Sequence, residues 1–131
     1  MPTITQGREE YMGTVLLVED STTDREIMSR HLQQLGFSVV IAKNSEEAQT
    51  KLQLQKPNLI ILDVILPGQS GFELCREIKS DPDTSQIPVV ICSTKDTEVD
   101  KLWGSMLGAD AYLPKPVQAN ELVQTIKQVI K

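Results

Sequence analysis

Short, uninterrupted runs of apolar residues recur along this chain of 131 residues and constrain its fold more than any other feature. The clearest runs are Val15–Val18, Leu59–Leu62, Val89–Cys92 and Ala111–Leu113. A strand that is covered on both faces reads as a continuous apolar segment, which is typical of a parallel sheet enclosed by helices. We therefore expect these runs to form strands of one parallel sheet.

Helical patterns separate the runs. Met28, Leu32 and Leu35 recur at a helical spacing, and Thr23 and Glu26 before them have the spacing of a capping box, which predicts that the helix opens there. A second strand is expected over residues 38–42. Further helices are expected from residue 44, around 74–78, over about 97–107 and from about residue 120. This alternation predicts an α/β domain with helices on both faces of the sheet.

Polar residues lie at or just after the ends of four predicted strands: Glu19 and Asp20, then Asp63, Ser93 and Lys115. The carboxyl ends of parallel strands meet at one edge of the sheet, where open α/β folds place their sites. Three carboxylates, a hydroxyl and an ammonium at such an edge suit a divalent cation and a phosphoryl group.

Asp63 is the candidate nucleophile of this site, because a carboxylate can attack a phosphoryl donor and form an acyl phosphate. Together with the acidic pair and the backbone carbonyl of Ile65, it would supply the hard oxygen ligands that Mg²⁺ requires. Lys115 and Ser93 would offer an ammonium and a hydroxyl to the phosphoryl oxygens.

Each of these signals is weak when taken alone. An acidic pair after a strand is commonly a solvated helix N-terminus, and an aspartate before a loop is commonly a turn residue. Lys115, between two prolines, could be an exposed loop lysine, and Ser93 could cap the next helix. Their occurrence in order, each at a strand end, favours one shared site.

Composition excludes several other classes. The chain is 40% hydrophobic, enough for the core of one domain. Four α/β units would use nearly all of its 131 residues, so we expect no separate output domain. A net charge of -5 argues against nucleic acid as a partner. Cys75 and Cys92 lack a metal-site spacing and are expected to be buried thiols. No signal peptide and no apolar run of about 18 residues is evident, so we expect a cytoplasmic protein without membrane insertion.

Five motifs together make the segment from Thr14 to Lys131 resemble the CheY-like receiver domain, the phosphoacceptor module of bacterial two-component response regulators. The motifs are Val15–Asp20, Asp63–Gly71, Ile87–Ser93, Gly108–Tyr112 and Lys115-Pro116. The resemblance implies a doubly wound, flavodoxin-like, five-stranded parallel sheet of order 2-1-3-4-5, with five helices on both faces. Residues 1–13, polar and without periodicity, are expected to be a flexible tail.

The resemblance also implies a role for each motif residue: Asp63 as the phosphorylated aspartate, Glu19 and Asp20 as the metal-binding pair, Ser93 and Tyr112 as the switch hydroxyl and aromatic, and Lys115 as the phosphate-pairing lysine. It implies Mg²⁺ as cofactor, a sensor histidine kinase and a downstream protein effector as partners, and a monomer or a phosphorylation-dependent dimer. The Lys115-Pro116 peptide is expected to be cis. Phosphorylation would draw Ser93 to the phosphoryl group and turn Tyr112 inward. The face formed by the fourth helix, fifth strand and fifth helix would then change its affinity for a protein partner.

Some positions depart from the family pattern. Thr94 stands where relatives often have alanine, and Ile65 and Lys95 flank the expected path of an attacking water. We therefore expect a longer-lived phosphorylated form than in relatives with polar residues there. The segment Thr97–Gly104, with Trp103, resembles the fourth helix of stand-alone regulators of the PilH type in type IV pilus systems.

Two functions other than that of a single-domain response regulator are alternatives. A phosphate sink or phosphorelay intermediate would use the same residues, and the sequence does not separate it from a regulator with its own effector. A phosphatase of the haloacid dehalogenase type would need a second aspartate two residues after the nucleophile. That position is Ile65, which argues against an enzyme.

Overall fold

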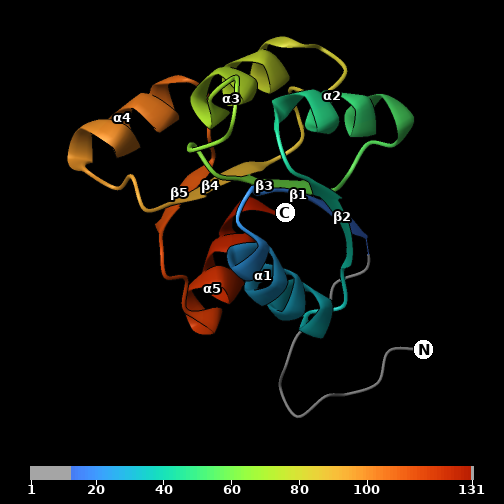
Figure 1. Cartoon of the computed structure of the whole chain (residues 1–131), viewed down its shortest axis with the longest axis vertical. Helices are drawn as coiled ribbons and strands as arrows, with labels where there is room; N and C mark the ends of the chain where they lie inside the picture. The colour runs from blue at the N-terminus through green and yellow to red at the C-terminus, as the bar shows by residue number, and fades with distance from the viewer. Residues whose placement is uncertain (1–12, 131) are drawn as a thin grey trace.

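In the computed structural model of this protein, residues 13–130 are described, and they alternate between strands and helices from end to end (Figure 1). The elements are β1 (Thr14–Val18), α1 (Thr22–Gln34), β2 (Ser38–Ala42), α2 (Ser45–Leu54), β3 (Leu59–Leu62), α3 (Gly71–Ser80), β4 (Val89–Ser93), α4 (Glu98–Met106), β5 (Ala111–Pro114) and α5 (Ala119–Val129). The tail expected over 1–13 lies outside the described residues except for Gly13. Within residues 13–130 no helix is long and apolar enough to cross a bilayer.

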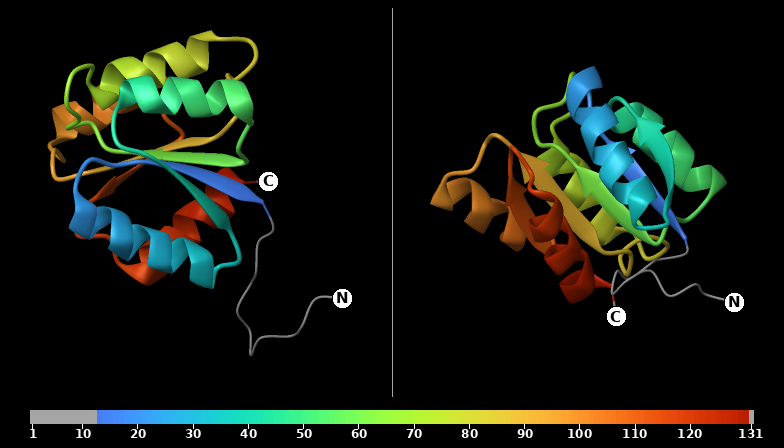
Figure 2. Two further views of the ribbon diagram at one scale, coloured as in Figure 1. Left: turned by 45° about the vertical axis from the view of Figure 1, so that its right-hand side comes forward. Right: turned by 90° about the horizontal axis from the view of Figure 1, so that it is seen from below.

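The five strands form one parallel sheet in the order β2-β1-β3-β4-β5, which confirms the expected α/β topology. Helices α1 and α5 cover one face, and α2, α3 and α4 cover the other (Figures 1 and 2). The register pairs Val18 of β1 with Leu62 of β3, and Leu62 with Ile91 of β4. As a result, the residues that follow these strands lie side by side at one edge.

Two apolar cores lie on the two faces of the sheet because successive strand residues point to opposite sides. Leu16, Ile60 and Ile91 belong to the core under α2 and α3. Leu17 and Ile61 belong to the core under α1 and α5. Since every strand in the middle of the sheet is covered twice, its sequence is apolar without alternation, as expected.

The start of α1 differs from the prediction. Ser21, not Thr23, is the N-cap, and its hydroxyl accepts a hydrogen bond from the backbone N–H of Asp24 at 3.3 Å. Ser21 and Asp24 have the same capping spacing as Thr23 and Glu26, two residues earlier, so the short polar segment offered two equivalent starts. The loop from β1 is consequently shorter, and the first turn of α1 lies close to the acidic pair.

Other local predictions are confirmed. The Lys115-Pro116 peptide is cis. Cys75 and Cys92 are buried free thiols, and burial raises their pKa values to about 11 and about 12. The helix expected over about 97–107 is α4 (Glu98–Met106), and the structure adds that Thr97 is its N-cap, with Asp100 completing a capping box.

Two glycines allow close approaches that a side chain would prevent. A Cβ atom on Gly71 would lie 1.9 Å from the backbone oxygen of Asp63, so the start of α3 packs directly on the end of β3. A Cβ atom on Gly104 would lie 3.1 Å from Ile91 and 3.1 Å from the ring of Tyr112. Although glycine is unfavourable inside a helix, Gly104 therefore lets α4 contact β4 and β5 closely.

Candidate functional site

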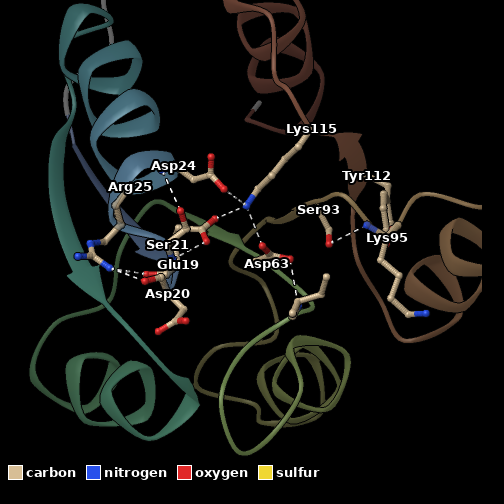
Figure 3. A network of polar contacts seen from close by, with 11 residues as sticks. Glu19, Asp20, Ser21, Asp24, Arg25, Asp63, Ser93, Lys95, Tyr112 and Lys115 are labelled. Atoms are coloured by element: carbon tan, nitrogen blue, oxygen red, sulfur yellow. Dashed lines mark hydrogen bonds and ion pairs between the residues drawn. The ribbon is translucent and has the colours of Figure 1, made fainter.

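Lys115 lies at the centre of the sheet edge, where its ammonium contacts three carboxylates (Figure 3). The Nζ atom is 2.7 Å from Glu19 Oε1, 2.8 Å from Asp63 Oδ2 and 2.8 Å from Asp24 Oδ2. These residues come from the ends of β1, β3 and β5 and from the first turn of α1. The predicted convergence of Glu19, Asp63 and Lys115 is therefore present in the structure.

The central ion pairs are buried on one side and open on the other. The side chains of Glu19 and Asp63 are each 7% exposed and that of Lys115 is 11% exposed, whereas that of Asp24 is 42% exposed. Burial opposes the charge of Lys115, but its hydrogen bonds to Asp24, Asp63 and Glu19 raise its pKa above the ordinary value. Burial raises the pKa of Glu19, although Lys115 counteracts it.

Asp63 is oriented through both of its oxygens. Oδ1 accepts a hydrogen bond from the backbone N–H of Ile65 at 3.0 Å, and Oδ2 accepts one from Lys115. The Asp63 backbone N–H donates to the carbonyl of Val18 at 3.1 Å, which extends the pairing of β1 and β3 by one residue. A cavity of about 70 Å³, lined in part by Glu19, Asp24, Asp63 and Lys115, reaches the carboxylate, so it is not enclosed by the core.

The loop after β1 is held by hydrogen bonds from α1. The guanidinium of Arg25 donates to the backbone carbonyls of Glu19 and Asp20, each at 3.1 Å, and the backbone N–H of Ser21 donates to Glu19 Oε2 at 3.1 Å. Asp20 is exposed, and its carboxylate points away from the Lys115 ammonium (Figure 3). Glu19 thus faces the site, while Asp20 lies at its rim.

Sequence reasoning missed Asp24 and Arg25 as residues of this site. Both lie in the first turn of α1, which follows the acidic pair directly. The signal that could have found them is the alternative helix start at Ser21, because it brings this turn to the same edge of the sheet as Glu19.

The oxygen atoms of Glu19 and Asp63 are of the hard type that Mg²⁺ prefers. Among residues 13–130, however, no three histidine, cysteine, aspartate or glutamate side chains are arranged to hold a metal ion. Instead, the Lys115 ammonium contacts two of the predicted ligands, Glu19 and Asp63. The donor chemistry therefore fits the cation, and a bound cation would have to compete with Lys115 for the oxygens of Glu19 and Asp63.

Ser93 and Tyr112 are connected through the backbone of Lys95 rather than directly to Asp63. The buried hydroxyl of Ser93 accepts a hydrogen bond from the Lys95 N–H at 3.2 Å, and the Tyr112 hydroxyl donates to the Lys95 carbonyl. Burial, followed by the nearby charge of Asp100, raises the pKa of Tyr112 to about 12. The hydroxyl therefore remains a donor across the physiological range.

The side chain of Lys95 runs away from Asp63 and contacts Asp100 on α4, with its Nζ 3.2 Å from Oδ1 (Figure 3). Of the two residues expected to flank an attacking water, Ile65 is 57% exposed beside Asp63, whereas the Lys95 ammonium is directed elsewhere.

The outer face of α4 carries an exposed apolar stripe. Its members are 47–74% exposed and recur at helical spacing: Val99, Leu102, Trp103 and Met106. The opposite side of the same helix is buried through Asp100 and Gly104, next to Tyr112. One short helix thus joins the Tyr112 ring to an apolar surface.

Comparisons with known proteins agree with this architecture. The family model described as response regulator receiver domain matches residues 15–127. The chain is 38% identical to protein PilH of Pseudomonas aeruginosa over 119 residues, which cover 91% of this chain and 98% of PilH.

Two solved structures extend the comparison. The chemotaxis response regulator CheY4 of Vibrio cholerae superposes with a TM-score of 0.84 at 31% identity, covering 91% of this chain and 99% of CheY4. The Mn²⁺-bound form of response regulator Rcp1 has a TM-score of 0.75 at 32% identity, covering 88% of this chain and 89% of that structure. The chain belongs to the family of response regulator receiver domains and is a signalling protein, not an enzyme with a separate substrate.

Proposed function

We propose that this chain is a cytoplasmic, single-domain response regulator that is phosphorylated on Asp63 by a sensor histidine kinase. The observation that carries this proposal is the contact of Asp63 with Lys115 at 2.8 Å, beside Glu19, at an edge where three strands end. A carboxylate held next to a cation and reached by a cavity can accept a phosphoryl group, and the cation offsets the added negative charge.

Glu19, Asp20, Asp63 and the Ile65 carbonyl would hold Mg²⁺ through hard oxygen atoms. The Mn²⁺-bound form of the similar regulator Rcp1 supports a divalent cation as cofactor, without identifying its ligands here. The bound cation would neutralise charge that develops on the phosphoryl oxygens. Arg25 would keep the backbone of the acidic pair in place, and Lys115 would donate to the phosphoryl group on Asp63. Ile65, exposed and apolar, would slow the approach of water.

Signal output would pass from Ser93 to α4. If the Ser93 hydroxyl turns to the phosphoryl group, the Lys95 N–H loses its acceptor, and the loop that also holds Tyr112 must adjust. Tyr112 contacts α4 at Gly104, so its movement alters the position of the apolar stripe. A downstream protein effector would bind this face, formed with β5 and α5, and the similarity to PilH supports a role in pilus motility.

Incubation with acetyl phosphate and Mg²⁺, followed by mass spectrometry, tests the phosphoacceptor. We expect one phosphoryl group on the wild type and on Asp96→Asn, which removes an exposed carboxylate from the loop between β4 and α4, and none on Asp63→Asn. Labelling of Asp63→Asn at the wild-type level would refute the assignment.

Co-precipitation from lysate with and without phosphorylation then tests the output. A partner gained by the phosphorylated wild type and lost in Leu102→Ser supports a regulator with its own effector. A protein that drains phosphoryl groups from its kinase without gaining a partner would instead be a phosphate sink or relay intermediate.

A further inference from the structure

Asp24 is a member of the site that the proposed phosphoryl chemistry does not use. A lysine ammonium has three N–H donors. In this structure each has its own carboxylate acceptor, from Glu19, Asp63 and Asp24, at 2.7–2.8 Å. All three donors of Lys115 are therefore engaged.

The three acceptors are not equivalent when a divalent cation binds. Glu19 and Asp63 are the residues expected to hold the cation, so their oxygens would be shared with a doubly charged ion or turned to it. The same ion repels the ammonium, because like charges a few ångströms apart interact unfavourably. Asp24 is the acceptor of the three that lies outside the expected ligand set.

The position of Asp24 is well defined by its helix. It is the third residue of α1, and its backbone N–H is capped by the Ser21 hydroxyl at 3.3 Å. Its side chain is 42% exposed, on the open side of the site. A carboxylate at this place can keep the ammonium close to Asp63 after the other two acceptors have turned to the cation.

We propose that Asp24 is a positioning residue for Lys115, which holds the ammonium within reach of the phosphoryl group when the metal ion is bound. This inference rests on the proposed phosphorylation of Asp63. Asp24 itself touches neither the phosphoryl group nor the metal. Its contribution is to hold the orientation of one lysine side chain.

The experiment compares Asp24→Asn and Asp24→Glu with the wild type. Glu26→Gln is the matched control, since it removes one exposed carboxylate from α1 at a position outside the contacts of Lys115. The first readout is the ¹⁵N NMR signal of the Lys115 ammonium in protein saturated with Mg²⁺. We expect it to persist in the wild type and Glu26→Gln, to vanish through rapid exchange with water in Asp24→Asn, and to return in Asp24→Glu.

The second readout is the initial rate of Asp63 phosphorylation by acetyl phosphate. We expect Asp24→Asn to be slower by about two- to fivefold, the effect of a partly exposed ion pair, with recovery in Asp24→Glu and no change in Glu26→Gln. A rate at or above that of the wild type in Asp24→Asn, or an unchanged ammonium signal, would overturn the inference. The NMR readout needs no phosphodonor, so it tests Asp24 even if labelling of Asp63 fails and the proposed function falls.

Discussion

Replacing Lys115 by methionine should destabilise the metal-free protein and make its stability strongly dependent on Mg²⁺. Methionine keeps the length and most of the volume of the side chain but removes the charge. Glu19 and Asp63 would then be two buried carboxylates without a cation between them. We expect the free energy of unfolding in EDTA to fall by about 2–4 kcal/mol.

This magnitude follows from the exposure of each partner. The side chains of Glu19 and Asp63 are each 7% exposed, and breaking a buried ion pair by removing one partner costs about 3–5 kcal/mol. Asp24, 42% exposed, adds less than about 1 kcal/mol. Glu19 has a raised pKa and can take up a proton in the variant, which relieves part of the repulsion and lowers the expected total.

Urea unfolding followed by far-ultraviolet circular dichroism measures the effect, first in EDTA and then in excess Mg²⁺. We expect a midpoint about 1–2 M lower for the variant in EDTA at an unchanged slope. Mg²⁺ should then stabilise the variant more than the wild type, because no ammonium competes for the oxygens of Glu19 and Asp63. Lys43→Met, at an exposed position just after β2, is the control and should remain close to the wild type.

Two results would contradict this reasoning. An unfolding free energy in EDTA equal to that of the wild type would mean that the Lys115 ammonium does not stabilise the three carboxylates in the folded protein. An equal gain from Mg²⁺ in both proteins would mean that the cation and the ammonium use different oxygens.

Three further outcomes are expected. Gly104→Ala should lower the free energy of unfolding by about 0.5–2 kcal/mol, because overpacking against Ile91 and Tyr112 exceeds the gain of about 1 kcal/mol in helix propensity. Ser105→Ala, at an exposed position of the same helix, should not lower it. A Gly104→Ala variant more stable than the wild type in thermal unfolding would refute the contact. Ile65→Asn should shorten the lifetime of phosphorylated Asp63 in a decay assay, and an unchanged rate would count against the role of Ile65. Since folding raises the pKa of Tyr112, its contribution to stability is full below the ordinary value of about 10 and is lost as the pH rises through about 12. An alkaline absorbance titration should show a phenol that ionises near pH 12 in the wild type and not in Tyr112→Phe; its persistence in the variant would exclude this assignment.

Much of the fold could be predicted because its signals are local. Apolar runs such as Leu59–Leu62 are continuous only when both faces of a strand are covered, and that condition gives the parallel sheet and the helices around it. Once parallel strands are assumed, their ends must meet at one edge, which brings Asp63, Glu19 and Lys115 together without knowledge of any loop. The predicted start of α1 at Thr23 was wrong because two capping sequences of equal spacing, one beginning at Ser21 and one at Thr23, lie within one turn.

The contacts inside the site depended on packing between segments far apart in the chain. Lys115 reaches Asp24 across 91 positions, a pairing that no local spacing encodes. The outward direction of Asp20 and the link from Ser93 through Lys95 to Tyr112 likewise follow from loop paths. The sequence by itself determined which elements form and which residues lie at their ends, since apolar pattern and strand direction decide both. The tertiary structure alone decided which carboxylates share the ammonium, because distances of a few ångströms depend on how helices and loops pack against the sheet.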